Sequence, residues 1–417
     1  MSVRVLSPVL RVLLPLALLG APAVGWAEPL TFSEALRAAV AESPDLAAGE
    51  LSVRAARSAA GPAGALPDPK LFAGLENFPI SGPPAFSFDD DMTMLTVGVM
   101  QEFPNRAKRG ARVARAQAEI EAAQAEVASQ RREVLDAAAR AWIELLYVER
   151  RIAALGLLDR ENRILAETVP GLIGSGAALP ADSTEPGLET AALANRRAEL
   201  NSLKLKARAE LRRWVGVLGN EGVAPTAPTF SIDPARLRAG LDEHPVLRAF
   251  EPALARAEAE TREARAARRP DFAVQAGFGA RNPDYGHMVS AQVTIDLPVF
   301  ASRRQDPLIA AKAAQAGRVR LQQEAARRRL AAELDSDLAE HQALAEELKR
   351  TRETILPLAR RKAELQLASF RAATIPFAPV LEARREQAEA ELRIIELEGE
   401  VAAKAARLTL YFGSEQP

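Results

Sequence analysis

The chain has no cysteine and few aromatic residues, and both absences limit the kind of protein it can be. Of its 417 residues none is cysteine and 5% are aromatic. Without cysteine it has neither disulfide bonds nor an N-terminal lipidated cysteine. So few aromatic side chains fit long helices with narrow packing seams better than a thick globular core. The formal net charge is −1, so the charge balance does not indicate binding to nucleic acid or to an anionic membrane surface.

Motifs for catalysis and for resident metals are also missing. No nucleophile–base pair or phosphate-binding loop is recognisable, and the three histidines lie far apart without the spacing of metal ligands. We therefore expect a protein that is not an enzyme and that needs no cofactor and no resident metal. Any energy for its function must then come from a partner.

The N-terminus contains the longest apolar run. Arg4 and Arg11 precede the apolar residues 12–24, and Gly25-Trp-Ala27 places small residues before a cut at Glu28. This pattern predicts a secretory signal peptide over residues 1–27. An uncleaved membrane anchor is the alternative, although the run is short for a span. No later segment is apolar enough for a transmembrane helix, so a membrane-embedded mature chain would need to form a β-barrel.

Two long stretches are almost free of helix breakers. The first, residues 105–169, contains no proline and is rich in alanine, arginine and glutamate. From Val113 to Leu155 its apolar residues recur in steps of three and four, with one break at Arg131, which is typical of a long helix packed closely on other helices. Such a helix would span roughly 100 Å. A second stretch, residues 303–370, repeats the pattern.

The second half of the chain repeats the first at an offset of about 200 residues. Glu42-Ser-Pro-Asp-Leu46 returns as Glu243-His-Pro-Val-Leu247, and the ending Val215-Gly216 returns as Phe412-Gly413. This predicts a signal peptide (1–27), a first repeat (28–216), a linker (217–234), a second repeat (235–413) and a tail (414–417). In the first repeat we expect strands at about 71–78 and 94–101, a long helix at 105–169 and a returning helix at 188–214. In the second we expect strands at about 272–279 and 288–296, a long helix at 303–370 and a returning helix at 380–411.

The expected strands alternate between apolar and small or polar residues. In the second pair, Phe272, Val274 and Phe278 fall on one face, and Val289 and Val293 follow the same alternation. This is the pattern of outer-membrane strands with one face toward lipid. Four strands cannot close a barrel, but three chains would supply twelve. A small soluble sheet is the alternative, and it would leave the two long helices unexplained.

Together, the duplication, the two helix breaks, the strand pairs and the glycine-terminated returning helices resemble the outer membrane efflux protein family, the TolC-like channels. The resemblance covers nearly the whole mature chain. It implies a mainly α fold with a small β part, in which duplicated long α-helical hairpins form a trimeric α-barrel. Four strands per chain would contribute to a shared 12-stranded outer-membrane β-barrel.

The resemblance also implies a location and a function. We expect a homotrimer in the bacterial outer membrane, in contact with its lipid and with a long periplasmic extension. It would be the passive exit duct of a tripartite efflux system, working with a periplasmic adaptor (membrane fusion) protein and an inner-membrane RND-type pump. A periplasmic adaptor or a structural coiled-coil protein is a weaker alternative, because neither needs the duplication together with the strands.

Two segments are similar to the heavy-metal subgroup of this family: Leu66-Pro-Asp-Pro69 and Met100-Gln-Glu-Phe-Pro104. They suggest heavy-metal cations as the exported substrate. A multidrug or type I secretion duct of the same fold is the alternative.

Family members are closed at the periplasmic end by carboxylates near the start of the returning helices. Here Glu382 matches the second acidic position of that pattern, whereas Pro379 replaces the first. Asp182 and Glu185 precede Pro379 and Glu382 by 197 residues. The candidate constriction is therefore Asp182, Glu185 and Glu382; the alternative is that these acids stabilise helix N-termini. The candidate adaptor-docking tips are Gly174, Ser175, Gly176, Arg371, Ala372 and Ala373.

Overall fold

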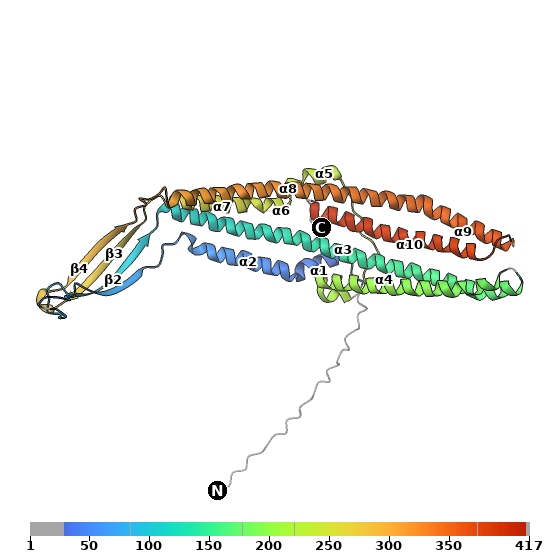
Figure 1. Ribbon diagram of the computed structural model, residues 1–417, viewed down its shortest axis with the longest axis horizontal. Coiled ribbons are helices and arrows are strands. Elements are labelled where there is room, and N and C mark those ends of the chain that lie inside the picture. Colours follow the sequence, from blue (N-terminus) through green and yellow to red (C-terminus); the bar gives the residue numbers. More distant parts are fainter. Residues whose placement is uncertain (1–28, 84, 177, 221, 373, 414–417) are drawn as a thin grey trace, which may run out of the picture.

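The chain forms a long, thin molecule with a small sheet at one end and helices along the rest of its length. The computed structural model describes residues 29–83, 85–176, 178–220, 222–372 and 374–413, so the expected signal peptide and tail lie outside the described residues. Figure 1 shows the strands at one end and two helix turns at the other. The predicted fold class, mainly α with a small β part, is confirmed. None of the described helices is both long enough and apolar enough to cross a membrane.

Four strands pair into one antiparallel sheet in the order β1-β2-β3-β4. They are Lys70–Glu76 (β1), Met94–Phe103 (β2), Phe272–Arg281 (β3) and Met288–Ile295 (β4). The first two strands come from the first half of the chain and the last two from the second, so the β2–β3 pairing joins the two halves. β1 and β4 are the outer strands, and each has one edge without a strand partner in the described part of the chain.

One face of this sheet is apolar across all four strands. The register places Ala73 opposite Val97 and Val97 opposite Phe278. Phe278 in turn lies opposite Val289, so all four side chains point to the same side. Val97 is 47% exposed and Val289 is 81% exposed. The other face carries small or polar residues such as Gly277. The alternation seen in the sequence is thus a property of the whole sheet.

The first long helix, α3, covers Arg106–Gly174. Asn105 caps it, because its side chain accepts the backbone N–H of Lys108 at 2.9 Å. The sequence suggested an end before Pro170, but the helix continues for about one more turn. A proline inside a helix removes one backbone hydrogen bond. Pro170 lies near the C-terminal end of α3, so this loss affects only the last turns of the helix. The turn between α3 and α4 is therefore shorter than a helix end before Pro170 would make it.

The second rod, expected as one helix over residues 303–370, is broken. Helix α8 covers Gln305–Arg350, α9 covers Leu356–Arg371, and a turn of π-helix at Thr351–Ile355 joins them. Pro357 follows directly and has no N–H to close a helical hydrogen bond four residues back. A single π-helical turn of this kind interrupts the regular hydrogen-bond ladder of an α-helix.

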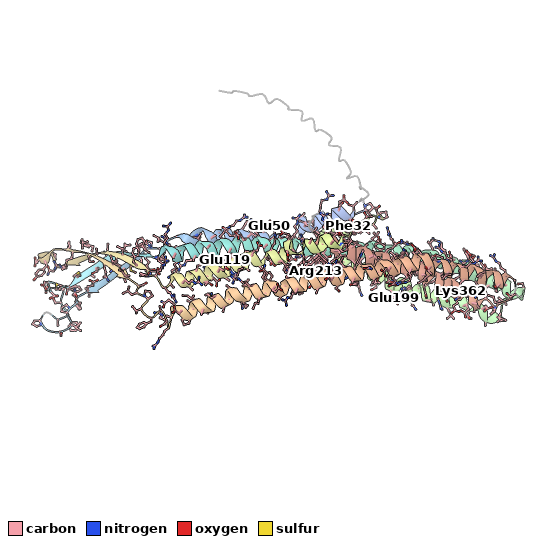
Figure 2. The ribbon with its side chains drawn as sticks, turned by 90° about the horizontal axis from the view of Figure 1, so that it is seen from above. Phe32, Glu50, Glu119, Glu199, Arg213 and Lys362 are labelled. Atoms are coloured by element: carbon pink, nitrogen blue, oxygen red, sulfur yellow. The ribbon has the colours of Figure 1, made fainter. Side chains whose placement is uncertain are left out.

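The remaining helices lie against these two rods. The returning helices α4 (Glu185–Val215) and α10 (Ala378–Arg407) pack on α3 and on α9, and α10 also contacts α3. Charged side chains such as Glu119, Glu199 and Lys362 lie along the surface (Figure 2). The shorter helices are α1 (Phe32–Glu42), α2 (Pro44–Ala60), α5 (Pro234–Ala239), α6 (Pro245–Arg248) and α7 (Phe250–Ala266).

The main core lies at mid-length, where α1, α3, α4 and the end of α10 meet. Trp142 is fully buried there, and its indole N–H donates to the carbonyl of Leu30 at 2.9 Å. The ring of Phe32 packs edge-on against Trp142 with 5.4 Å between ring centroids. A second apolar cluster, around Leu334 and Phe412, forms the core of the matching part of the second half. The two hairpins, α3–α4 and α9–α10, project from this mid-length core (Figure 1).

Ser43 and His244 occupy equivalent positions at the two helix breaks, and each is buried. Each side chain accepts a backbone N–H of the following helix at 3.3 Å. The Nε2 of His244 lies 2.9 Å from the carbonyl oxygen of Tyr411, to which it donates, so the ring is held as the neutral tautomer. Burial, with the nearby Arg132 guanidinium, lowers the pKa of His244 from 6.5 to about 4.

A buried charged cluster links the two halves beside the core. Arg407 of α10 binds Asp136 of α3 at 3.1 Å and Asp337 of α8 at 2.7 Å. Lys404 adds a second cation on Asp337 at 2.8 Å, and Arg140 adds one on Asp136 at 3.2 Å. Asp136 is 2% exposed, and burial raises the pKa of its carboxyl although both arginines oppose that change. Arg407 therefore bridges one carboxylate from each half of the chain.

Candidate functional site

Two helix turns, packed against each other, form the end of the molecule opposite the sheet. One joins α3 to α4 and the other joins α9 to α10 (Figure 1). Val169 and Ala178 from the first turn share one apolar cluster with Phe370, Phe377 and Val380 from the second. The ring centroids of the two phenylalanines are 5.2 Å apart. The two turns are thus held together as a single tip.

The residues expected to dock an adaptor lie where the chain reverses at this tip. Residues 174–176 end and cap α3, and all three are exposed. Gly176 has a φ of +74°, a conformation that glycine adopts at little cost. Arg371 ends α9 and Ala372 follows it, both exposed. Ala373 lies outside the described residues.

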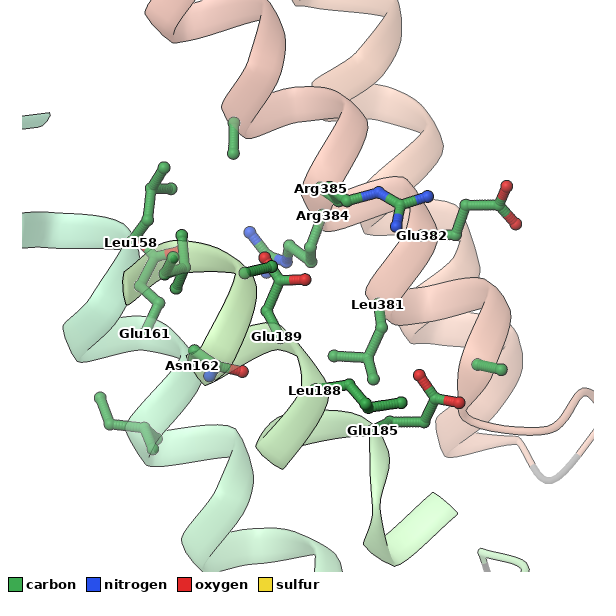
Figure 3. A pocket seen from close by; sticks show the side chains of 15 residues that line it. Leu158, Glu161, Asn162, Glu185, Leu188, Glu189, Leu381, Glu382, Arg384 and Arg385 are labelled. Carbon is green, nitrogen blue, oxygen red and sulfur yellow. The ribbon is translucent and has the colours of Figure 1, made fainter. Parts of the chain in front are cut away.

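A cavity of about 720 Å³ opens between the two hairpins, close to the tip. Its walls are α3, α4 and α10 (Figure 3). Leu158 and Asn162 contribute from α3, Leu188 from α4 and Leu381 from α10. Figure 3 shows Leu188 and Leu381 pointing toward each other across the cavity. The cavity therefore joins helices from both halves of the chain.

The structure separates the three carboxylates of the expected constriction. Glu185, on α4, and Glu382, on α10, both line the cavity. Asp182 does not line it: its side chain is buried, and its Oδ2 accepts the backbone N–H of Leu179 at 2.8 Å. Asp182 thus caps a short 3-10 turn before α4.

Glu189 is the carboxylate that sequence reasoning missed. Glu189 and Glu382 are each the fifth residue of their returning helix, and each follows a proline by three positions. Glu185, at an offset of 197, is the first residue of α4 and has no such match. The segments Pro186-Gly-Leu-Glu189 and Pro379-Val-Leu-Glu382 carried the signal, at an offset of 193. Glu189 also lines the cavity.

Carboxylates without partners dominate one side of the cavity. Within the described ranges, Glu161, Glu185 and Glu189 form no ion pair and no side-chain hydrogen bond. On the opposite wall, Arg384 extends toward Glu189 in Figure 3. Arg385 pairs with a glutamate on its own helix at 4.0 Å. The α3 and α4 walls are thus acidic and the α10 wall is basic. In the part of the chain that the structure describes, no three histidine, cysteine or acidic side chains gather as a metal site.

Solved structures with the same arrangement of helices and strands are membrane proteins, and one of them is described as an outer membrane channel. VceC, an outer membrane protein of Vibrio cholerae, is 17% identical and has a TM-score of 0.77, with 92% of this chain and 96% of VceC covered. A membrane protein from Pseudomonas aeruginosa is 16% identical with a TM-score of 0.78, covering 92% and 89%. The open state of the Neisseria gonorrhoeae MtrE outer membrane channel is 16% identical with a TM-score of 0.70, covering 92% and 88%.

These structures define the fold of this chain: one small sheet and two long helical hairpins. The family follows from the sequence itself. A family model described as outer membrane efflux protein matches residues 35–217 and 237–414. The chain belongs to the outer membrane efflux protein family, whose members are channels and not enzymes. A comparison with curated protein sequences gave no match.

Proposed function

We propose that three copies of this chain form the passive exit duct of a tripartite efflux system. Twelve strands would close into a ring in the outer membrane, and the long helices would continue the tunnel into the periplasm. The observation that carries this proposal is the sheet. It has two open edges and one exposed apolar face, so a single chain leaves backbone groups unpaired. Copies placed edge to edge satisfy those groups and present one continuous apolar band to lipid.

Cross-linking the outer strands tests this assembly. The natural chain lacks cysteine, so Ala73→Cys on β1 and Ala291→Cys on β4 introduce the sole thiols. Both positions are exposed on the apolar face. With a bifunctional thiol reagent the double variant is expected to give covalent dimers and trimers in outer membranes, because β1 of one copy lies beside β4 of the next. Each single variant is the control and should remain monomeric. A double variant that stays monomeric argues against the ring.

The same proposal assigns partners to the tip. The exposed residues 174–176 and Arg371 are the part of the molecule farthest from the sheet (Figure 1). We infer that a periplasmic adaptor docks there and connects the duct to an RND-type inner-membrane pump, which supplies the energy. A duct of this kind needs no catalytic group of its own.

Heavy-metal cations are the cargo that we propose for this duct. The support is the sequence similarity of residues 66–69 and 100–104 to the heavy-metal subgroup, together with the acidic side of the cavity near the tip. Deletion of the gene, followed by growth on copper, zinc, cobalt, cadmium, dyes and antibiotics, tests the cargo. Sensitivity to metals alone is expected. Sensitivity confined to dyes and antibiotics would instead identify a multidrug duct.

Near the tip, we propose that Glu382 and its counterpart Glu189, with Glu185, form the constriction of the assembled duct. Three copies would bring nine carboxylates to this level and favour cations. The variant Glu382→Gln removes one charge per copy. Because one unit charge about 4 Å from a permeating ion contributes about 1 kcal/mol in a water-filled pore, the potassium-to-chloride permeability ratio in planar bilayers should fall about fivefold or more.

Glu364→Gln is the matched control for this measurement, because Glu364 is exposed on α9 and lies outside the cavity. It should leave the permeability ratio unchanged. A ratio that is the same in Glu382→Gln and in the natural chain would remove Glu382 from the constriction. Glu189→Gln, measured separately, shows whether the first hairpin contributes as the second does.

A further inference from the structure

The overall net charge of −1 conceals a local excess of positive charge where the strands join the helices (Figure 1). Four segments make up this junction: 66–70, 101–109, 268–271 and 296–306. They contain eight basic and five acidic side chains, a net charge of +3. At the other end of the sheet, residues 85–93 and 281–287 contain four acids and one arginine. The two ends of the sheet therefore carry opposite charge.

Most acids of the junction are neutralised by their neighbours, whereas four of its arginines are not. The paired acids are Glu102 with Lys70, Asp271 with Lys108 and Asp306 with Arg268. Four exposed arginines form no ion pair and no side-chain hydrogen bond with other described residues: Arg106, Arg269, Arg303 and Arg304. We call these four the basic collar. Their guanidinium groups are free to bind an anionic ligand, and their geometry suits phosphate.

The basic collar lies directly beyond the last row of the apolar face of the sheet. That row consists of Phe103, Phe272 and Ile295, which lie opposite one another across β2, β3 and β4. The rings of Phe103 and Phe272 stack with 5.1 Å between centroids, and Ile295 is 55% exposed. Arg106 follows Phe103 by three residues, and Arg269 precedes Phe272 by three. Arginines at the edge of an apolar band are typical of the boundary between hydrocarbon and lipid headgroups.

The chain between β4 and α8 adds exposed apolar side chains next to the collar. Leu297 is 68% exposed, Val299 71% and Phe300 65%. Arg303 and Arg304 follow Phe300 within four residues. A free phosphate ion or a soluble polyanion would gain nothing from these apolar side chains. A lipid leaflet offers phosphates to the guanidinium groups and hydrocarbon to the apolar side chains, so it matches both features.

We propose that the basic collar binds anionic phospholipids, of the phosphatidylglycerol type, in the leaflet nearest the helices. The guanidinium groups donate N–H bonds to the phosphate oxygens, and Leu297, Val299 and Phe300 enter the adjoining hydrocarbon. A zwitterionic headgroup also carries a phosphate, but its own ammonium group offsets the attraction of the arginines. This inference rests on the proposed duct function, because it requires the apolar face of the sheet to lie in a bilayer.

The lipid preference can be measured by electron paramagnetic resonance on the mature chain in phosphatidylcholine vesicles. Spin-labelled phosphatidylglycerol should associate with the chain about fivefold more strongly than spin-labelled phosphatidylcholine at low salt. The preference should nearly vanish at about 1 M sodium chloride, where charges are screened within about 3 Å. Inorganic phosphate should lower it no more than chloride at equal ionic strength, because the site binds a lipid and not the free ion. Equal association of the two lipids at low salt would overturn the proposal.

Variants locate the preference. The double variant Arg303→Gln/Arg304→Gln should lower it from about fivefold to about twofold, because two of the four collar charges are lost. Arg131→Gln/Arg160→Gln is the matched control, since it removes two exposed arginines of α3 that lie outside the junction. It should leave the lipid preference unchanged. An unchanged preference in Arg303→Gln/Arg304→Gln overturns the proposal.

The cross-link between β1 and β4 reports the assembly separately, so the two proposals can fail independently. A cross-linked trimer without a lipid preference overturns the role of the collar and leaves the duct. A chain that prefers the anionic lipid but does not cross-link supports the collar and overturns the duct. If Arg303→Gln/Arg304→Gln abolishes the cross-link and keeps the lipid preference, a neighbouring copy covers these arginines, and the collar proposal is wrong.

Discussion

Replacing Arg407 with methionine is expected to lower the free energy of unfolding by about 2–3 kcal/mol, because two carboxylates lose charge-assisted hydrogen bonds while each keeps one other cation, Arg140 on Asp136 and Lys404 on Asp337. Arg407 is the residue that bonds to both Asp136 and Asp337. Methionine has a similar volume, so loss of packing contributes little. The effect is measured as the shift of the thermal or guanidinium unfolding midpoint of the detergent-purified chain, followed by circular dichroism.

Arg328→Met is the matched control for this variant. Arg328 pairs with Glu324 on its own helix at 2.7 Å, but its side chain is 78% exposed. Such a pair contributes about 0.3–0.5 kcal/mol, so the midpoint should barely move. Adding Asp136→Asn to Arg407→Met should recover part of the loss, because it removes a buried charge that has lost one of its two cations. Equal shifts for Arg407→Met and Arg328→Met would show that the buried cluster does not couple the two halves.

Acid is expected to destabilise the fold through His244. Its pKa in the fold is about 4, below the ordinary 6.5, so the fold holds the neutral ring. The stability that this ring contributes is fully present above pH 6.5 and is lost as the pH falls from 6.5 toward 4. A difference of this size corresponds to about 3 kcal/mol. Unfolding midpoints of the natural chain between pH 7.5 and pH 4.5 measure the loss.

His244→Asn separates this effect from other titrations over the same range. Asparagine can still accept the N–H of the following helix as a cap, but it does not titrate. The variant should therefore lose about 2–3 kcal/mol less stability between pH 7.5 and pH 4.5 than the natural chain. His287→Asn is the control, because His287 is exposed near the sheet. Identical pH profiles for the natural chain and His244→Asn would contradict the assignment.

The rods and the sheet could be predicted from the sequence because both depend on short-range patterns. The apolar steps around Ala138 and Leu145 mark the buried seam of α3, and both residues are fully buried in the core. The alternation around Val97 and Val289 gives one apolar face whatever the neighbouring strand is. Family membership followed from the order of these elements in both halves, and the match to the family model confirms it.

Other features depend on contacts that a one-dimensional pattern does not contain. The offset between the halves changes from 197 to 193 at the tip, because ten residues separate α3 from α4 and six separate α9 from α10. A fixed offset therefore pairs Glu382 with Glu185 instead of Glu189. The π-helical turn at Thr351–Ile355 interrupts a heptad pattern that continues through it. Nor could the cavity be foreseen, since it exists only once α10 is placed against α3.

The open edges of β1 and β4 also determine how the newly exported chain behaves before it is assembled. In water, two unpaired strand edges beside a continuous apolar face are a template for indiscriminate strand addition, and so for aggregation. The helices carry no such hazard, because they satisfy their own backbone and are covered with charge. Recovery of soluble, unassembled chain is therefore limited by the 35 residues of the four strands, at one end of a rod of about 100 Å.

The small sheet, and not the long helices, thus sets the solubility of the chain until neighbouring copies and lipid cover it.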